Sequence, residues 1–218
     1  MKKLFSLDGP VLRFLLKLGQ LILLGLCWFV CSIPLVTVGM STTALMRSCF
    51  DLREDKEDIF KTFFKTYLAK WKVSTAAFLV LGGFFILLYC IPQVAAFLGS
   101  QILSILAIGI TSAAYLLLWL VLSCVFPVAA YFDTTPKKTM RNALFVALKD
   151  RKQSIPVAIA SAIPVVLFLA LPEVLYRITW LWVIVYPGIC GYFTACRFAP
   201  VFLAYGNKKE EHDKEETT

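Results

Sequence analysis

The sequence predicts an all-α protein, a polytopic helical bundle that spans a membrane. The stretch between Lys17 and Arg47 carries no charged residue, and it is longer than the ~20 apolar residues with which a helix crosses a bilayer. Further uncharged apolar runs follow it along the chain. A hydrophobic content of 59% and a mean hydropathy of +0.76 agree with this fold class.

The uncharged runs define five hydrophobic segments, which charged residues, prolines and glycines separate. A chain of 218 residues with this composition has room for one integral membrane domain, which we place at residues 1–205. Residues 206–218 are polar and mixed in charge, so we expect a disordered C-terminal tail there. The five segments are Leu18–Val38, Val73–Leu98, Ile102–Tyr131, Ile155–Leu171 and Thr179–Ala199.

The first hydrophobic segment has two interpretations. Pro34 and Gly39 interrupt it, and a helix usually ends or kinks at the residue before a proline. The hydroxyl residues Ser41, Thr42 and Thr43 follow, and such side chains can cap the start of a new helix. The segment is therefore either one long tilted helix or a span followed by a re-entrant half-helix, with the break at Pro34–Gly39.

The basic residues favour the second interpretation. The loops 47–72 and 132–154 and the C-terminus are rich in Lys and Arg, and the positive-inside rule places them in the cytoplasm. A hairpin at Pro34–Gly39 returns the chain to the cytoplasm and leaves Arg177 as the sole basic loop residue outside. Five simple crossings would also put the basic N-terminus outside. We therefore expect the hairpin, with the N-terminus in the cytoplasm.

Two segments that precede spans have the pattern of basic amphipathic helices. The first, within 51–72, has an acidic start that suits the dipole of a helix, and Lys61 and Lys65 stand beside an aromatic face. This pattern suits the headgroup boundary of an anionic leaflet, or a helix that packs beneath the spans. The aromatic face consists of Ile59, Phe60, Phe63, Phe64, Tyr67, Leu68 and Trp71.

The second amphipathic segment begins at Thr135-Pro136, an N-cap followed by proline at the first helical position. Basic residues surround its apolar stripe, and the segment leads directly into the span that starts at Ile155. The two segments together indicate a weak internal repeat, in which a span is followed by a basic amphipathic helix and another span. The stripe consists of Met140, Ala143, Leu144, Ala147 and Leu148.

The sequence lacks the residue patterns of common catalytic and metal sites. The single histidine, His212, lies in the tail, which argues against His-based triads and His-rich metal centres. The seven cysteines form no C-x-x-C pair, and no acidic residue falls in the middle of a span, where ion-coupled carriers place one. We therefore predict that the protein is not an enzyme, with no catalytic, cofactor-binding or metal-binding residues and no cofactor.

Five residues are candidates for a functional or membrane-anchoring role: Arg47, Arg197, Lys61, Lys65 and Trp71. Arg47 and Arg197 are the charges nearest to the membrane interior, although long basic side chains near helix ends often reach the headgroups. The expected partners are the bilayer and anionic headgroups at its cytoplasmic face. The net charge of +8 follows the loops and indicates membrane topology, not nucleic-acid binding.

The order of these features resembles the YesL family, small bacterial membrane proteins of unknown function. The resemblance extends from about Leu4 to Leu203 and implies a bacterial cytoplasmic-membrane protein, often encoded beside carbohydrate-uptake genes. It supplies no catalytic residues. It rests on the aromatic span around Trp28, on Pro34 and Gly39 before Ser41-Thr42-Thr43-Ala44-Leu45, and on Asp58-Ile59-Phe60-Lys61-Thr62-Phe63-Phe64 with Tyr67 behind it.

Two functions remain open from the sequence. The uncharged spans and the charged cytoplasmic face favour a non-catalytic accessory or scaffold protein, which would associate with an ABC-type sugar importer or with copies of itself. The alternative is a small transporter or facilitator for a polar solute such as a sugar, which would need a polar path. The spans offer few polar residues for such a path, so we favour the accessory function.

Overall fold

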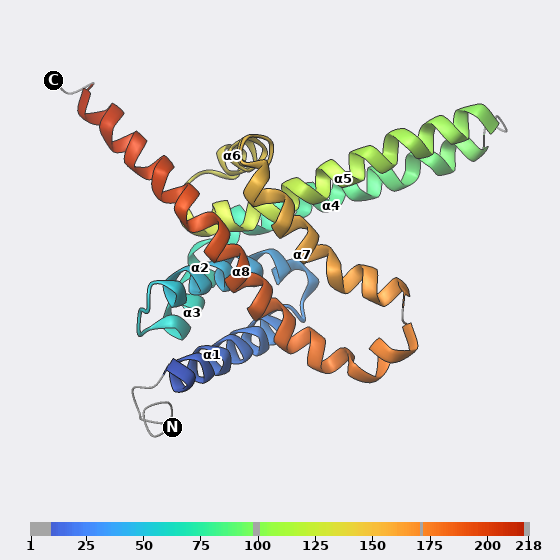
Figure 1. The fold of residues 1–218 in the computed structure, drawn as a ribbon. Helices are drawn as coiled ribbons and strands as arrows, with labels where there is room; N and C mark the ends of the chain where they lie inside the picture. The colour runs from blue at the N-terminus through green and yellow to red at the C-terminus, as the bar shows by residue number, and fades with distance from the viewer. Residues whose placement is uncertain (1–9, 98–100, 171, 216–218) are drawn as a thin grey trace.

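The computed structural model describes residues 10–97, 101–170 and 172–215, and this part of the chain is all α, as predicted. These residues form eight α-helices and a short 3₁₀ helix, with no strand among them, and Figure 1 shows how the helices are arranged. The elements are α1 (Pro10–Cys31), η1 (Leu35–Thr37), α2 (Val38–Arg53), α3 (Ile59–Ala69), α4 (Trp71–Phe97), α5 (Gln101–Tyr131), α6 (Pro136–Lys149), α7 (Arg151–Ala170) and α8 (Pro172–Glu215).

Four of the described helices are long and apolar enough to cross a bilayer. They are Phe14–Cys31 within α1, and α4, α5 and α7, which match the first four predicted hydrophobic segments. The fifth predicted segment, Thr179–Ala199, is helical as part of α8, and its first side chains lie outside the described residues. The membrane character of the chain is therefore a property of its helices as well as of its composition.

The first hydrophobic segment folds as a hairpin. α1 ends at Cys31, and the Thr37 hydroxyl donates hydrogen bonds to the carbonyl oxygens of Cys31 and Pro34, both at 2.6 Å. α2 then returns beside α1, and near the turn Trp28 Nε1 donates a hydrogen bond to Thr42 Oγ1 at 3.0 Å. α2 has 16 residues and is about 24 Å long, shorter than a typical hydrocarbon core. The predicted break at Pro34–Gly39 is confirmed, and a single long helix is excluded.

α2 lies at the centre of the molecule (Figure 1), in contact with α1, α3, α4, α5 and α8. Its buried side chains form much of the core, together with aromatic residues from α5 and α8. The rings of Phe50, Tyr131 and Phe202 pack with centroids 5.1–5.9 Å apart at one end of the bundle. A short helix is thus surrounded by longer ones.

The helices pair as three antiparallel hairpins, α1–α2, α4–α5 and α7–α8. In each hairpin, a polar contact joins the two arms at the end away from the turn. The Lys17 ammonium lies 2.7 Å from Asp55 Oδ1, between the start of α1 and the turn after α2. Lys70 and Asp133 make the corresponding ion pair for α4–α5, at 2.5 Å. The Tyr205 hydroxyl donates to Asp150 Oδ2 at 2.7 Å for α7–α8. The short amphipathic helices α3 and α6 connect the hairpins, as the predicted repeat requires.

The C-terminal helix extends beyond the predicted start of the tail. α8 continues through Gly206 to Glu215. The lysines and glutamates of this segment are good helix formers. The disorder expected for residues 206–218 is not tested by this finding and stays a prediction. Residues 216–218 lie outside the described residues.

Candidate functional site

Helix α3 and the first residue of α4 place three of the predicted residues on an exposed surface, Lys61 and Lys65 on α3 and Trp71 on α4. Ile59 and Phe63 of its aromatic face are buried against the bundle. Phe60 and Tyr67 are partly buried and pack against the same core. Phe64 and Trp71 expose about half of their surface (50% and 52%), beside the exposed Lys61 and Lys65. The predicted single face therefore divides into a packed side and an exposed aromatic side. The geometry of α3 therefore fits both a helix at the headgroup boundary and a helix that packs beneath the spans. The anchoring role of its lysines stays a prediction.

The two arginines occupy different environments. Arg47, on α2, lies 3.6 Å from Asp51 one turn further along, and Asp51 is buried and also binds Lys56 at 3.1 Å. Arg197, on α8, has its guanidinium 5.8 Å from the centroid of the Phe193 ring. Its Nε atom is buried and has no hydrogen-bond partner in the described part of the chain. The structure does not bring the two arginines together into one site.

Three consecutive hydroxyl residues of α2 connect this helix to its neighbours. The Ser41 and Ser32 hydroxyl oxygens lie 2.6 Å apart, and Thr42 accepts the hydrogen bond from Trp28. Thr43 is fully buried and accepts a 2.8 Å hydrogen bond from the Ser74 hydroxyl of α4. The run that sequence analysis interpreted as a helix cap thus forms interhelical contacts. Its signal was the unbroken run of hydroxyls in an apolar stretch.

A small cavity of about 180 Å³ lies between α2, α5, α7 and α8. Its polar lining consists mainly of hydroxyl groups, whose protons are donated within the protein. Thr194 donates to the Cys190 carbonyl at 2.7 Å, and the Ser123 and Ser161 hydroxyl oxygens lie 3.1 Å apart. The cavity therefore offers uncharged acceptors to a small guest. It is lined by Thr42, Met46, Trp119, Leu122, Ser123, Phe126, Pro127, Val157, Ser161, Cys190 and Thr194.

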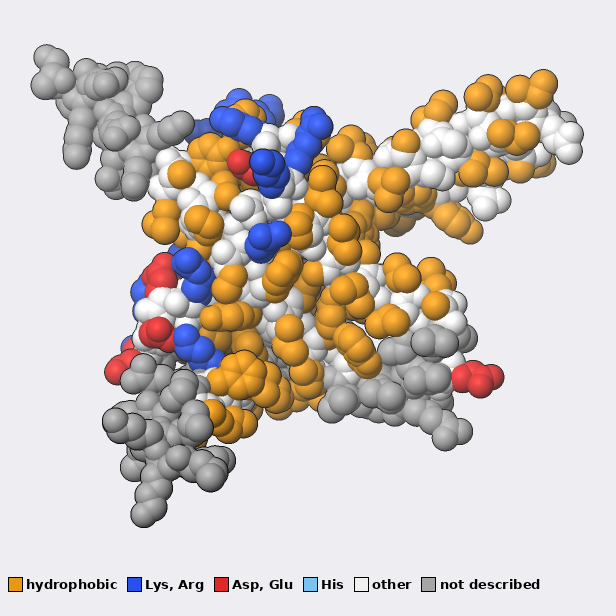
Figure 2. Space-filling view, viewed as in Figure 1, with side chains coloured by type: hydrophobic (Ala, Val, Ile, Leu, Met, Phe, Trp, Pro, Cys, Tyr) orange, Lys and Arg blue, Asp and Glu red, His pale blue; other side chains and the backbone are white. Residues whose placement is uncertain are grey.

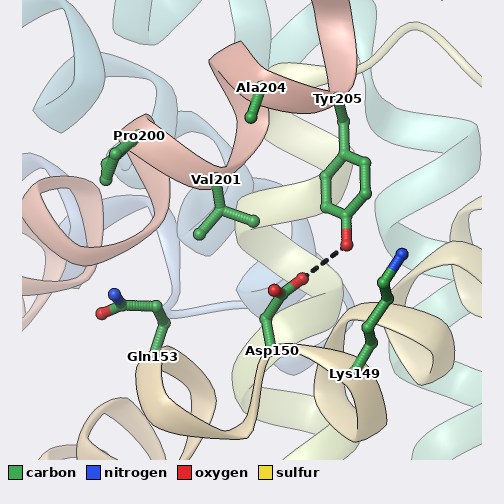
Figure 3. Close-up of a pocket in the computed structure, with 7 residues that line it drawn as sticks. All are labelled: Lys149, Asp150, Gln153, Pro200, Val201, Ala204 and Tyr205. Atoms are coloured by element: carbon green, nitrogen blue, oxygen red, sulfur yellow. Dashed lines mark hydrogen bonds between the residues drawn. The ribbon is translucent and has the colours of Figure 1, made fainter. Parts of the chain in front are cut away.

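A second, open cavity of about 390 Å³ lies where α8 passes the junction of α6 and α7 (Figure 3). Tyr205 enters it from α8, and its hydroxyl points toward Asp150. Burial first, and then the bond to Asp150, raises the pKa of Tyr205 to about 12, so this phenol is a hydrogen-bond donor near neutral pH. The Lys149 ammonium lies 4.9 Å from the Phe145 ring centroid, close enough for a cation–π contact. Sequence analysis did not identify this cluster.

Basic side chains gather over α6 and near α3, while apolar side chains cover the projecting α4–α5 hairpin (Figure 2). Within the described residues, no three His, Cys, Asp or Glu side chains form a group that could hold a metal ion. The side-chain chemistry that the structure assembles consists of hydroxyls, cations and aromatic rings. The prediction of a non-enzymatic protein without cofactors is not tested by this arrangement and stays a prediction.

The comparison with protein families found a match in the N-terminal half of the chain. Residues 21–90 match the model of the family described as "Protein of unknown function, DUF624". The matched stretch extends from α1 to α4 and includes the hydroxyl residues of α2 and the amphipathic helix α3. Searches of the curated proteins and of the solved structures found no match. Over this stretch the chain is similar to an uncharacterised family.

Proposed function

We propose that this protein is a non-catalytic accessory or scaffold protein of a bacterial membrane, which binds another integral membrane protein through its α4–α5 hairpin. The observation that carries the proposal is the projection of this hairpin from the bundle (Figure 1). Beyond Leu81 of α4 and before Val121 of α5, the buried residues of the described hairpin are Ala95, Ala107 and Thr111. Long apolar surfaces of both helices therefore face away from the protein.

The composition of this surface supports a protein partner. Gly83 and Gly109 are exposed, and a Cβ atom added at either residue would meet no atom within 4 Å. Small residues on a membrane helix allow another helix to approach closely. The hairpin is also held together internally, because the Tyr115 hydroxyl donates to the Phe85 carbonyl at 3.2 Å. The hairpin thus offers a preformed apolar surface with an exposed glycine on each of its two helices.

The identity of the partner is proposed from the sequence resemblance alone. The resemblance to the YesL family implies a carbohydrate importer of the ABC type, and the matched family is one of unknown function. A second copy of the chain is the alternative occupant of the hairpin. The basic residues near α3 and α6 would lie at the anionic cytoplasmic leaflet, as the positive-inside rule predicts. This orientation places the loops 47–72 and 132–154 in the cytoplasm.

The experiment is purification from native membranes in mild detergent, with substitutions on the hairpin. We expect a stoichiometric membrane partner that Gly83→Leu removes. Gly19→Leu is the matched control, because Gly19 of α1 also has open space around it. A partner that persists in Gly83→Leu, or the absence of any stoichiometric partner from wild-type membranes, contradicts the proposal. Recovery of tagged and untagged copies of this chain together would identify self-association.

The cavity of about 180 Å³ favours a second candidate function, a facilitator for a small polar solute. Binding pockets for drug-sized ligands are usually ~300–1,000 Å³, so this cavity is small for a sugar, and the accessory function is the better supported. Sugar flux into liposomes that contain the purified protein alone would reject the accessory function. In that case Thr194→Val, which removes a lining hydroxyl while retaining similar side-chain volume, should lower the flux.

A further inference from the structure

A groove on the molecule is lined almost entirely by apolar residues, with one cationic residue among them. It has a volume of about 520 Å³ and lies between the α4–α5 hairpin and α6. Leu81, Phe84 and Leu88 of α4 form one wall, and Leu117 and Leu118 of α5 form another. The side chain of Arg141 on α6 is the one charged residue among the groove-lining residues.

Arg141 also lines an adjacent cavity of different character. This cavity, of about 440 Å³, lies between the end of α5, α6 and α8. Lys138 and Asn142 line it together with Arg141, so it offers two cations and an amide. Lys138 and Arg141 are three residues apart on α6 and therefore neighbours on one helical surface. The apolar groove and the basic cavity thus meet at a single side chain.

The charges in the basic cavity are not neutralised by the described part of the chain. Lys138 and Arg141 are both exposed, and neither takes part in the ion pairs of the described residues. The nearest acidic residues in the sequence, Asp133 and Asp150, bind Lys70 and Tyr205. The site consequently carries an excess of positive charge beside a long hydrocarbon-lined surface.

We propose that this surface binds one anionic phospholipid, with its phosphate between Lys138 and Arg141 and an acyl chain in the groove between α4, α5 and α6. Arg141 suits the boundary, because its aliphatic stem can line the groove while its guanidinium binds phosphate. An acyl chain that enters the groove moves from one hydrocarbon environment to another, so this step favours no lipid class. The charge of the headgroup should therefore determine which phospholipid binds. The proposal requires insertion in a membrane but is independent of the accessory function.

The test is native mass spectrometry of the purified protein in detergent, with phosphatidylglycerol and phosphatidylcholine supplied in equal amounts. We expect one retained phosphatidylglycerol and little phosphatidylcholine. The double variant Lys138→Gln/Arg141→Gln should lower phosphatidylglycerol retention about tenfold to thirtyfold, since each basic residue near an anionic headgroup contributes roughly fivefold. The matched control Lys61→Gln/Lys65→Gln removes two exposed cations from α3 and should change retention less than about twofold.

A groove variant separates a bound lipid from a bound anion. Ala114 lines the groove on α5, and Ala114→Phe should fill part of it without altering the charges. We expect this variant to lose phosphatidylglycerol while its binding of inorganic phosphate stays as in the wild type. Equal retention of the two lipids, an equal loss in the α3 control, or full lipid retention in Ala114→Phe would each overturn the proposal. Size-exclusion profiles that match the wild type show that the variants are folded.

Discussion

The ammonium of Lys17 and the carboxylate of Asp55 lie 2.7 Å apart, although 37 residues of chain lie between them. Asp55 adopts a left-handed backbone conformation, with φ of 54°, which Asp tolerates better than most residues because its short polar side chain bonds locally. This ion pair brings the start of α1 beside the turn after α2. The start of α1 and the turn that leads into the amphipathic helix α3 therefore lie at the same end of the molecule.

Cysteine labelling should reveal this arrangement in cells. In a cysteine-free background, we expect an impermeant maleimide to label Leu35→Cys from outside, because Leu35 of η1 is 77% exposed at the hairpin turn. Ser6→Cys, Lys61→Cys and Lys137→Cys should react only after permeabilisation. Labelling of Ser6→Cys in intact cells would contradict the hairpin topology. In preparing the background, Cys49 is best replaced by alanine, because it is fully buried against Gly191.

Glycines should control the close crossing of α1 and α8. A Cβ atom added at Gly25 would lie 1.8 Å from the Ile184 carbonyl oxygen, and one at Gly188 would lie 2.2 Å from that of Leu21. Because backbone atoms cannot move aside as a flexible side chain can, we expect Gly25→Ala and Gly188→Ala each to destabilise the protein by about 1–3 kcal/mol. The measurement is unfolding in a detergent titration.

The control for the crossing is Gly19→Ala in the same helix α1. Nothing lies within 4 Å of a Cβ atom at Gly19, and alanine is the better helix former. Gly19→Ala should therefore be neutral or stabilising by up to about 1 kcal/mol. Equal losses of stability at Gly19 and Gly25 would show that helix crossing is not the cause.

The hydrogen bond between Ser74 and Thr43 should couple α4 to α2. Interhelical hydrogen bonds in membrane proteins contribute about 0.6 kcal/mol on average and at most about 1.7 kcal/mol. We expect a double-mutant cycle with Thr43→Val and Ser74→Ala to give a coupling energy in this range. Ser112→Ala is the control partner, since the Ser112 hydroxyl donates to the Ile108 carbonyl of its own helix at 2.7 Å. A coupling as large between Thr43 and Ser112 would contradict the assignment.

The sequence predicted where the helices lie along the chain better than which helices contact one another. Pro34 and the placement of basic residues predicted the hairpin, since proline restricts the backbone and charge restricts topology. The same reasoning could not show that Thr43 meets Ser74, because each has other hydroxyl residues beside it in the sequence and no local pattern pairs them. Uniformly apolar helices such as α4 and α5 carry no periodicity that identifies a packed face. The projection of their hairpin was therefore not predictable.

Some residues of the candidate sites were likewise recognisable from the local sequence, while others depended on tertiary contacts. The exposed lysines of α3 were recognisable from their helical spacing beside aromatic residues. Arg141 was one basic residue among many in the second amphipathic segment, and only the fold places it between a groove and a cavity. Tyr205 and Asp150 lie far apart in the sequence, and the contact between them depends on the path of α8. Tertiary contacts of this kind leave no local pattern.

The ion pair of Lys70 and Asp133 should make stability depend on pH in the acid range. The hydrogen bond and the charge of Lys70 hold the pKa of Asp133 below its usual range. A lowered pKa in the folded state stabilises the protein above the ordinary pKa of aspartate, and this contribution is lost as the pH falls through the lowered value. Asp133→Asn should therefore be less stable than the wild type at neutral pH. The difference in midpoint temperature should disappear in strong acid.

Lys70 should matter more than Asp133 at neutral pH. The Lys70 side chain is 16% exposed and also donates to the Phe132 carbonyl at 2.9 Å, whereas the Asp133 side chain is 95% exposed. Loss of the ammonium removes both the ion pair and the hydrogen bond to the Phe132 carbonyl, whereas Asp133→Asn retains that hydrogen bond. Exposed ion pairs alone contribute little to the free energy of unfolding. We therefore expect Lys70→Met to lower the midpoint temperature more than Asp133→Asn. Equal effects of the two substitutions would show that the ion pair, and not the bond to the Phe132 carbonyl, joins the two helices.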